Sequence, residues 1–315
     1  MNTLEAMRTF VRVVDSGGFS AAARQLAVAV SSVTRQIDAL EAELGAQLLR
    51  RSTRAVILTD AGETYYAQAT RILDDLDELH RSLGGLDAAP RGLLRVTLPV
   101  AFGRLHVAPH VPAFLAQYPD LELDLLMSDA VTNLVEANAD LAVRIGGTDD
   151  PGLVARKLAP HHRVVCASPA YLEEHGTPTS PADLASHRCL TFAYGSRQKS
   201  WRFRRNGKVE EVRVRGPLHA NNAEVLCTAA VQSVGLVLMA TWLVSDAIRR
   251  KHLVAVLTDH EASPGSFDSD IHAMFPPSRR SSLKVRCFID FFQKQFGSPP
   301  YWDAGWPSFK RPSPG

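Results

Sequence analysis

Residues 18–45, GFSAAARQLAVAVSSVTRQIDALEAELG, contain two short helical patterns separated by a tight connection. Ser20 is a suitable N-cap for an alanine-rich helix that runs from Ala21 to Leu26. After the connection, apolar side chains recur along one helical stripe that ends at Gly45, namely Val33, Ile37, Leu40 and Leu44. Two short helices joined in this way predict a helix-turn-helix.

The sequence on either side of this stretch completes a small domain. Upstream, apolar residues follow a helical period from Leu4 to Val14, and Gly17-Gly18 stops that helix. Downstream, the β-formers at positions 56–58 are framed by arginines at positions 50, 51 and 54. Residues 1–60 are therefore predicted to form a helix-turn-helix domain with a small basic wing.

A heptad pattern follows over residues 61–87. Its apolar positions step by four and three residues through Tyr65, Ala69, Ile72, Leu76, Leu79 and Leu83. The helix either packs on its own domain or pairs with a second chain. We favour pairing through 65–83, because the seam lies beside an expected linker, Ala88–Gly92, which we interpret as a hinge.

From Leu93 the pattern alternates between strands and helices. Strands are expected at 93–98, 121–127, 141–145, 164–167, 234–239 and 271–275, with helices between them, including 131–137, and a closing helix at 283–296. Such alternation predicts mostly parallel sheets covered by helices, and its length predicts two α/β lobes over 93–296. The proline-rich residues 297–315 are expected to be an unfolded tail.

Several runs together resemble the LysR-type transcriptional regulators. They are the two helical runs above, Leu48-Leu49-Arg50-Arg51, Leu58-Thr59-Asp60-Ala61-Gly62, Phe114–Pro119, Asp140–Gly146 and Lys284–Asp290. The resemblance spans roughly residues 2–296 and is greatest to the subgroup with Phe102-Gly103-Arg104-Leu105 after the first effector-domain strand. It implies an α/β chain: a winged helix-turn-helix, a long linker helix and a bilobed effector domain like that of type 2 periplasmic binding proteins.

The predicted DNA contacts lie at the start of the second helical run and on the wing. Polar side chains near the start of that run lie opposite its apolar stripe, and Arg35 there has the geometry to bind guanine O6 and N7. Where the family usually has a polar residue this chain has Val30, which can contact only a thymine methyl. The predicted DNA-binding residues are Ser20, Val30, Ser31, Ser32, Thr34, Arg35, Arg51, Arg54 and Thr59.

The resemblance also implies a small-molecule effector in the cleft between the lobes, at the carboxyl ends of strands. The matching positions are Pro99, Val100, Ala101, Phe102, Ser128, Arg144, His219 and Asn221. Hydroxyl, amide and backbone N–H groups at helix starts suit an anion such as a carboxylate. Each of these groups has a structural alternative, as a helix cap or a packing residue.

Composition limits the other classes of protein. With 35 Lys and Arg against 33 Asp and Glu, the net charge of +2 argues against a polycation that coats nucleic acid or membrane. The first residues do not resemble a signal peptide, and the longest apolar stretch, Val234–Val244, is too short to span a membrane, so we expect a cytoplasmic protein. The four scattered cysteines predict neither a zinc ribbon nor a disulfide framework.

We therefore expect no enzyme, metal or cofactor, but a ligand-responsive regulator. Its expected partners are operator DNA, an effector, a second chain, further copies in a tetramer and RNA polymerase. A bilobed solute-binding protein without a DNA role is the alternative. The cationic run Arg197–Lys208 is interpreted as a hairpin turning at Asn206-Gly207 rather than as a second nucleic-acid site.

Overall fold

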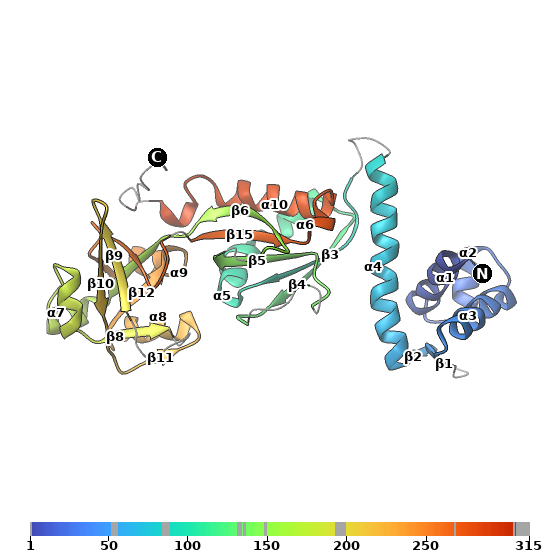
Figure 1. Cartoon of the computed structure of the whole chain (residues 1–315), viewed down its shortest axis with the longest axis horizontal. Helices are drawn as coiled ribbons and strands as arrows, with labels where there is room; N and C mark the ends of the chain where they lie inside the picture. Colours follow the sequence, from blue (N-terminus) through green and yellow to red (C-terminus); the bar gives the residue numbers. More distant parts are fainter. Residues whose placement is uncertain are drawn as a thin grey trace. The chain divides into compact units, whose positions relative to one another are not determined.

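The computed structural model describes residues 2–51, 56–83, 89–130, 134, 137–147, 150–192, 200–267, 269–304 and 306 (Figure 1). The chain divides into two compact units, Met1–Ala88 and Ala89–Gly315. The first unit holds the helical N-terminal residues and the long helix that follows them, whereas the second holds the alternating strands and helices.

The first unit contains a three-helix core and a two-stranded wing. Its elements are α1 (Thr3–Asp15), α2 (Phe19–Leu26), α3 (Val30–Leu44), β1 (Leu49–Arg51), β2 (Val56–Leu58) and α4 (Asp60–Leu83). Val33, Ile37 and Leu40 of the α3 stripe are fully buried, in one cluster with Phe10 and Val13 of α1 and Ala22 of α2. Leu44, which the sequence assigned to the same stripe, is 44% exposed and lies outside this core. The predicted helix-turn-helix is present, and β1 and β2 pair antiparallel as its wing.

Two of the expected helix starts are displaced by one or two residues. The helix α2 begins at Phe19 with Gly18 as its N-cap, so the predicted capping role of Ser20 is wrong. Ser20 instead lies exposed in the first turn of α2. The helix α3 begins at Val30, one residue before the expected start, and Ala29 gives it no side-chain cap.

The wing and α4 meet closely, which explains why Thr59 and Gly62 occupy their positions. Thr59 caps the helix, because its hydroxyl oxygen accepts a hydrogen bond from the Gly62 N–H over 3.0 Å. A Cβ on Gly62 would lie only 2.0 Å from the Leu48 carbonyl oxygen. Glu41 of α3 accepts hydrogen bonds from the N–H groups of Leu48 and Leu49 over 2.7 and 3.0 Å, which fixes the start of the wing.

The heptad seam of α4 has two halves with different environments. Its first half packs within the unit: Ala69 is buried, and the Tyr65 ring meets Phe10 edge to face at 5.4 Å between centroids. Its second half is open, with Ile72 48% exposed and Leu79 56% exposed, while the Leu83 side chain lies outside the described part. The first half of the seam therefore supports packing of α4 within its own unit, and the second half supports pairing with a second chain.

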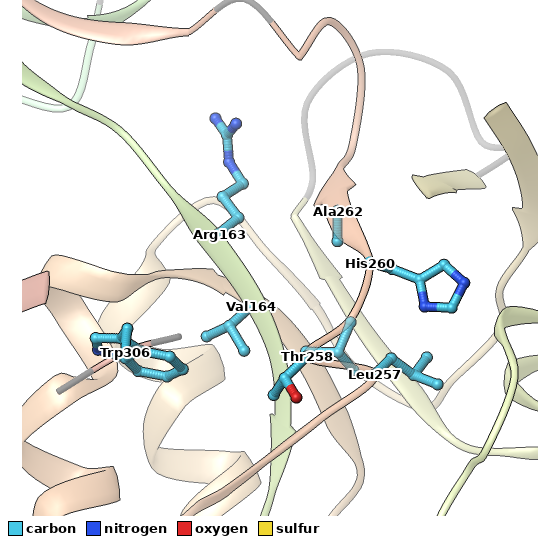
Figure 2. A pocket seen from close by; sticks show the side chains of 8 residues that line it. Arg163, Val164, Leu257, Thr258, His260, Ala262 and Trp306 are labelled. Atoms are coloured by element: carbon cyan, nitrogen blue, oxygen red, sulfur yellow. The ribbon is translucent and has the colours of Figure 1, made fainter. Parts of the chain in front are cut away.

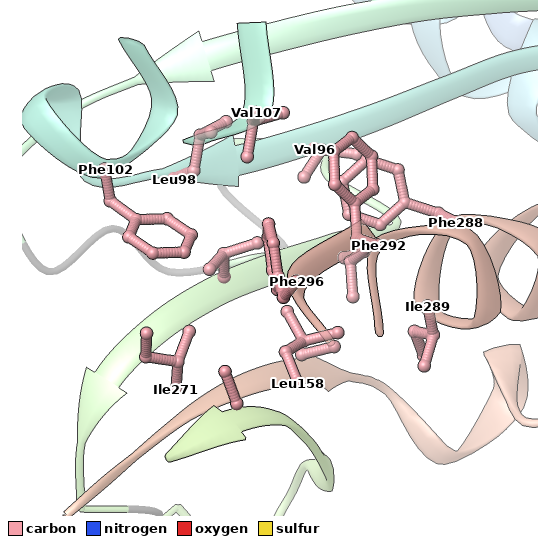
Figure 3. Close-up of a cluster of buried hydrophobic side chains, with 14 of the residues drawn as sticks. Val96, Leu98, Phe102, Val107, Leu158, Ile271, Phe288, Ile289, Phe292 and Phe296 are labelled. Atoms are coloured by element: carbon pink, nitrogen blue, oxygen red, sulfur yellow. The ribbon is translucent and has the colours of Figure 1, made fainter. Parts of the chain in front are cut away.

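The second unit has two lobes, and the first is built on one five-stranded sheet with strand order β4-β3-β5-β15-β6. Its elements are β3 (Gly92–Leu98), α5 (Val100–Phe102), η1 (Gly103–Val107), η2 (Ala108–His110), α6 (Val111–Gln117), β4 (Leu121–Met127), β5 (Leu141–Gly146), β6 (Val154–Pro160), β15 (Asp270–Phe275), η4 (Pro277–Arg279) and α10 (Leu283–Phe296). Phenylalanines of α10 and α5 fill the core against the sheet (Figure 3).

The second lobe combines a five-stranded sheet, of order β11-β8-β12-β7-β13, with a three-stranded one, of order β10-β9-β14. Its elements are β7 (Arg163–Ala167), α7 (Pro169–His175), η3 (Pro181–Ser186), β8 (Cys189–Phe192), β9 (Ser200–Arg205), β10 (Lys208–Arg213), β11 (His219–Ala220), α8 (Ala223–Val231), β12 (Leu236–Ala240), α9 (Thr241–Arg249), β13 (Val254–Val256) and β14 (Glu261–Ser263). The strands β9 and β10 form the predicted hairpin at Asn206-Gly207, where both residues have positive φ. Trp201 and Phe203 are buried in it and so cannot stack on bases.

The two five-stranded sheets are mixed and the three-stranded sheet is antiparallel, which corrects the expectation of mostly parallel sheets. In the first lobe β15 runs antiparallel to β5 and β6, and in the second β7 runs antiparallel to β12 and β13. The chain crosses to the second lobe after β6 and returns before β15, and the first strand after each crossing, β7 or β15, is the one that runs against its neighbours. The expected helix at 131–137 falls largely outside the described residues.

The expectation of an unfolded tail from residue 297 is wrong for its first part. Residues 301–303 form the short helix η5 (Tyr301–Asp303), and Trp302 is only 2% exposed. Aromatic side chains provide enough apolar surface to dock this segment despite its prolines. Residues 307–315 lie outside the described part.

Candidate nucleic-acid interface and effector cleft

The first turns of α3 present polar and small side chains on the face opposite the buried stripe. Val30, the first residue of the helix, is 44% exposed, and Ser31 and Arg35 are also exposed. Because Val33, Ile37 and Leu40 hold the opposite face in the core, the orientation of α3 is fixed. Such an exposed N-terminal face is what a recognition helix needs in order to reach base edges.

Three of these polar groups make contacts with their own helix. Arg35 donates from Nε to the Ser31 carbonyl oxygen over 3.3 Å and from its terminal nitrogen to Ser32 Oγ over 3.4 Å. The Thr34 hydroxyl donates to the Val30 carbonyl oxygen over 3.0 Å. The two arginine contacts are long, and exposed hydrogen bonds of this length exchange readily for contacts with DNA.

The three residues of the wing region that were predicted to bind DNA are described to different extents. Arg51 lies in β1, where its side chain is not among those described, and Arg54 falls outside the described residues. The Thr59 hydroxyl donates its one hydrogen to the Gln47 carbonyl oxygen over 2.7 Å and accepts from Gly62. Thr59 therefore has a structural role in the wing, and its contact with DNA stays a prediction.

In the first lobe the structure brings Pro99, Val100 and Ser128 to one edge of the sheet. The Ser128 N–H donates to the carbonyl oxygen of Leu98 over 3.0 Å, which places the end of β4 beside the end of β3. The Val100 N–H donates to a carboxylate oxygen of Asp129 over 3.0 Å. The backbone at the start of α5 therefore already holds a carboxylate, supplied by a residue that the sequence did not single out.

Phe102 and Ala101 are not presented at this edge, because both side chains are buried. Phe102 is 0% exposed, and its ring packs edge to face on Trp242 at 5.4 Å and on Phe296 at 5.7 Å between centroids. The expectation that Phe102 touches an effector is wrong for this arrangement, because its side chain is inside the core. Arg144 is half-buried in β5 opposite His272, and burial lowers its pKa.

The predicted effector residues of the second lobe lie just before α8. His219 is exposed, with Nδ1 2.6 Å from the Thr191 hydroxyl oxygen, and Asn221 is exposed. The neighbouring Asn222 is the N-cap of α8, accepting hydrogen bonds from the N–H groups of Glu224 and Val225. Asn222 is thus a structural residue that sequence reasoning missed, although an asparagine before a helical run is its usual signal.

A direct link between the lobes was also missed. Arg104 of η1 forms an ion pair with Glu224 in the first turn of α8. Arg104 belongs to the Phe102–Leu105 run and Glu224 follows the polar residues His219–Asn222, so both stood next to predicted positions. Their ion pair joins η1 of the first lobe to the first turn of α8 in the second.

The second lobe also holds a small pocket of about 10 Å³, which is separate from these residues. Figure 2 shows it with Arg163, Thr258 and His260, whose polar ends point in different directions. Burial lowers the pKa of Arg163 to about 10. None of the predicted effector residues lines this pocket, and its polar groups do not converge on one point.

Comparison with known proteins agrees with the two units. The family model "Bacterial regulatory helix-turn-helix protein, lysR family" matches residues 4–63, and "LysR substrate binding domain" matches residues 87–297. The chain is 34% identical over 294 residues to "Probable HTH-type transcriptional regulator LtrA" of Klebsiella pneumoniae, covering 93% of this chain and 95% of that one. It is likewise 34% identical to "HTH-type transcriptional regulator DmlR" of Escherichia coli (strain K12), covering 93% and 94%.

Solved structures give the same result. The LysR-type regulator CrgA of Neisseria meningitidis superposes with a TM-score of 0.58 at 33% identity, covering 93% of this chain and 98% of that one. The full-length virulence activator AphB of Vibrio cholerae gives 0.55 at 28% identity, covering 92% and 98%. Across the described residues, no helix combines the length and the apolarity that crossing a membrane requires. The chain therefore belongs to the LysR family: it is a DNA-binding transcriptional regulator with a substrate-binding effector domain.

Proposed function

We propose that α3 reads a dyad-symmetric operator in the major groove and that a small anionic effector between the lobes controls this binding. The observation that carries the proposal is the fixed orientation of α3. Val33, Ile37 and Leu40 are buried on one face, while Val30, Ser31 and Arg35 are exposed. Ser32, Thr34 and the wing arginines Arg51 and Arg54 complete the proposed contact set, with Ser20 on the neighbouring helix.

The open half of α4 supports pairing of two chains. Ile72 and Leu79 leave a large part of their apolar surface in water, and a second copy of α4 would cover it. Two chains related by a two-fold axis place two copies of α3 on successive half-sites, which explains the proposed symmetry of the operator. Further contacts between the effector units of different chains would give a tetramer. The regulator would work in the cytoplasm on chromosomal DNA, where RNA polymerase is a further partner.

The contact between Val100 and Asp129 supports an anionic effector. A backbone N–H that holds a side-chain carboxylate at 3.0 Å offers the same contact to a ligand carboxylate once Asp129 moves away. Pro99, Ser128 and the half-buried Arg144 lie in the same lobe, and His219 and Asn221 come from the other lobe. Such a ligand changes the arrangement of the lobes only by the difference between its affinities for the two arrangements.

Selection of bound duplexes from a random DNA pool tests the DNA-binding part. We expect an enriched site with two symmetric halves about one or more helical turns apart. Enrichment without sequence preference would contradict the reading role of α3. Titration with a panel of small carboxylates, monitored by thermal unfolding, tests the effector part, and Asp129→Ala should strengthen the binding of any carboxylate that responds.

A further inference from the structure

The segment that follows α10 folds back over the second unit. We name residues 297–304 and Trp306 the C-terminal strap. The match to the effector-domain family model ends at residue 297, so all of the strap after its first residue lies beyond the part that this chain shares with the family model. Its helix η5 carries three consecutive residues, Tyr301, Trp302 and Asp303, that each make a different contact.

The strap is anchored in the first lobe by two aromatic side chains. The Trp302 ring lies 4.6 Å from the His106 ring and 5.1 Å from the Phe296 ring, between centroids. The Tyr301 hydroxyl donates to His106 Nδ1 over 2.6 Å, since His106 Nε2 donates to the Trp242 carbonyl oxygen over 3.0 Å. Burial lowers the pKa of His106 to about 4, so the ring stays neutral and keeps both roles at physiological pH.

The strap also contacts the second lobe, through Trp302 and Trp306. Ser245 of α9 places its hydroxyl oxygen 2.6 Å from the Trp302 carbonyl oxygen. The indole N–H of Trp306 donates to that hydroxyl oxygen over 3.2 Å, and the Trp306 ring packs on the apolar cluster of the second lobe. The helix α9 is thus fastened to the strap at a buried position, because Ser245 is itself buried.

A third contact reaches one of the two places where the chain crosses between the lobes. His162 lies between β6 and β7, and its Nδ1–H donates to a carboxylate oxygen of the buried Asp303 over 2.8 Å. The carbonyl oxygen of His162 accepts in turn from the Thr241 N–H at the start of α9, over 2.9 Å. Contacts to both lobes and to the crossing therefore come from four residues, Tyr301, Trp302, Asp303 and Trp306, which lie close together in the sequence.

We propose that the C-terminal strap fixes the arrangement of the two lobes and thereby sets how much binding energy an effector must supply to change it. A rotation of the lobes about the crossing has to break the contact to His106, to Ser245 or to His162, because one short segment makes all three. The regulatory consequence rests on the proposed effector response, whereas the mechanical part stands without any effector or DNA.

The test measures the distance between the lobes in the full chain. Spin labels are placed at Asp120→Cys in the first lobe and Glu173→Cys in the second, both exposed positions, after Cys227→Ala and Cys287→Ala remove the two partly exposed thiols. Labelled chains are diluted with unlabelled ones so that only distances within one chain contribute. Pulsed electron paramagnetic resonance then gives the distance distribution without ligand.

We expect one narrow distribution for the parent chain and for a control chain that ends at Trp306. The shape-conserving pair Tyr301→Phe with Asp303→Asn, and separately Trp302→Ala, should give a broader or displaced distribution. Circular dichroism checks that each variant is folded, and if Trp302→Ala fails to fold, the shape-conserving pair decides. An unchanged distribution in the folded variants would overturn the proposal, even if their unfolding temperature falls, because the strap would then support only one lobe. Since neither effector nor DNA is present, a failure of the proposed function cannot produce this result.

Discussion

Replacement of Leu79 by alanine tests whether the open half of α4 pairs with a second chain. Leu79 is 56% exposed, and burying a whole leucine side chain stabilises by about 1.5–3 kcal/mol. Covering the exposed half in a dimer is therefore worth roughly 1 kcal/mol per chain, or about 2 kcal/mol for both copies. Leu79→Ala should weaken the dimer by roughly 30-fold in Kd, since about 1.4 kcal/mol corresponds to a factor of ten.

Leu79→Asp should act more strongly, because an unpaired carboxylate in an apolar seam costs several kcal/mol. Sedimentation velocity over a concentration series measures the dimer dissociation constant of each variant. Val209→Ala is the matched control, since this apolar residue on β10 is exposed to a similar degree and lies outside the seam. A dimer constant that is unchanged in Leu79→Asp would refute the pairing role and leave α4 as a helix of its own unit.

Two further variants test local parts of the account. Gly62→Ala places a methyl group 2.0 Å from the Leu48 carbonyl oxygen, so the wing must shift. Operator affinity, measured by a fluorescence anisotropy titration, should therefore fall. Gly265→Ala is the control: its methyl group would have no atom within 4 Å, so this variant should bind the operator normally. Hydrogen bonds from Thr179 and Ser180 lower the pKa of Asp183 to about 2, so the carboxylate stabilises the fold above its unfolded pKa, and this contribution is lost as the pH falls through the folded value. Asp183→Asn should therefore lower the urea midpoint at pH 7, and its difference from the parent should shrink as the pH drops from about 4 towards 2; a constant difference would contradict the assignment.

Local side-chain periodicity explains what the sequence could predict. The helix-turn-helix followed from Val33, Ile37 and Leu40, because a single helix must bury a stripe of that spacing whatever surrounds it. The hairpin at Asn206-Gly207 followed from residues that tolerate positive φ. Both signals are contained within a few neighbouring residues.

The remaining features depend on contacts between distant segments. Phe102 was expected at the cleft, but its burial results from Trp242 and Phe296, which are far away in sequence. The ion pair of Arg104 with Glu224 has the same origin. The strap was missed because prolines dominated the interpretation of residues 297–315, although the aromatic residues at 301, 302 and 306 were a signal for docking.

The central claim is that the exposed face of α3 reads bases, and Arg35→Ala tests it most directly. Binding of the variant to the selected operator, to single-base operator variants and to random DNA is measured over a salt series, with Arg213→Ala on β10 as the control. Arg54→Ala, expected from the sequence to lose a phosphate contact, should weaken all DNA alike and reduce the salt slope by about one. Arg35→Ala should instead lose about 1–3 kcal/mol of preference at one base pair of each half-site and keep its affinity for random DNA. An Arg35→Ala protein that still prefers every operator base pair as strongly as the parent would show that α3 only anchors the backbone of DNA.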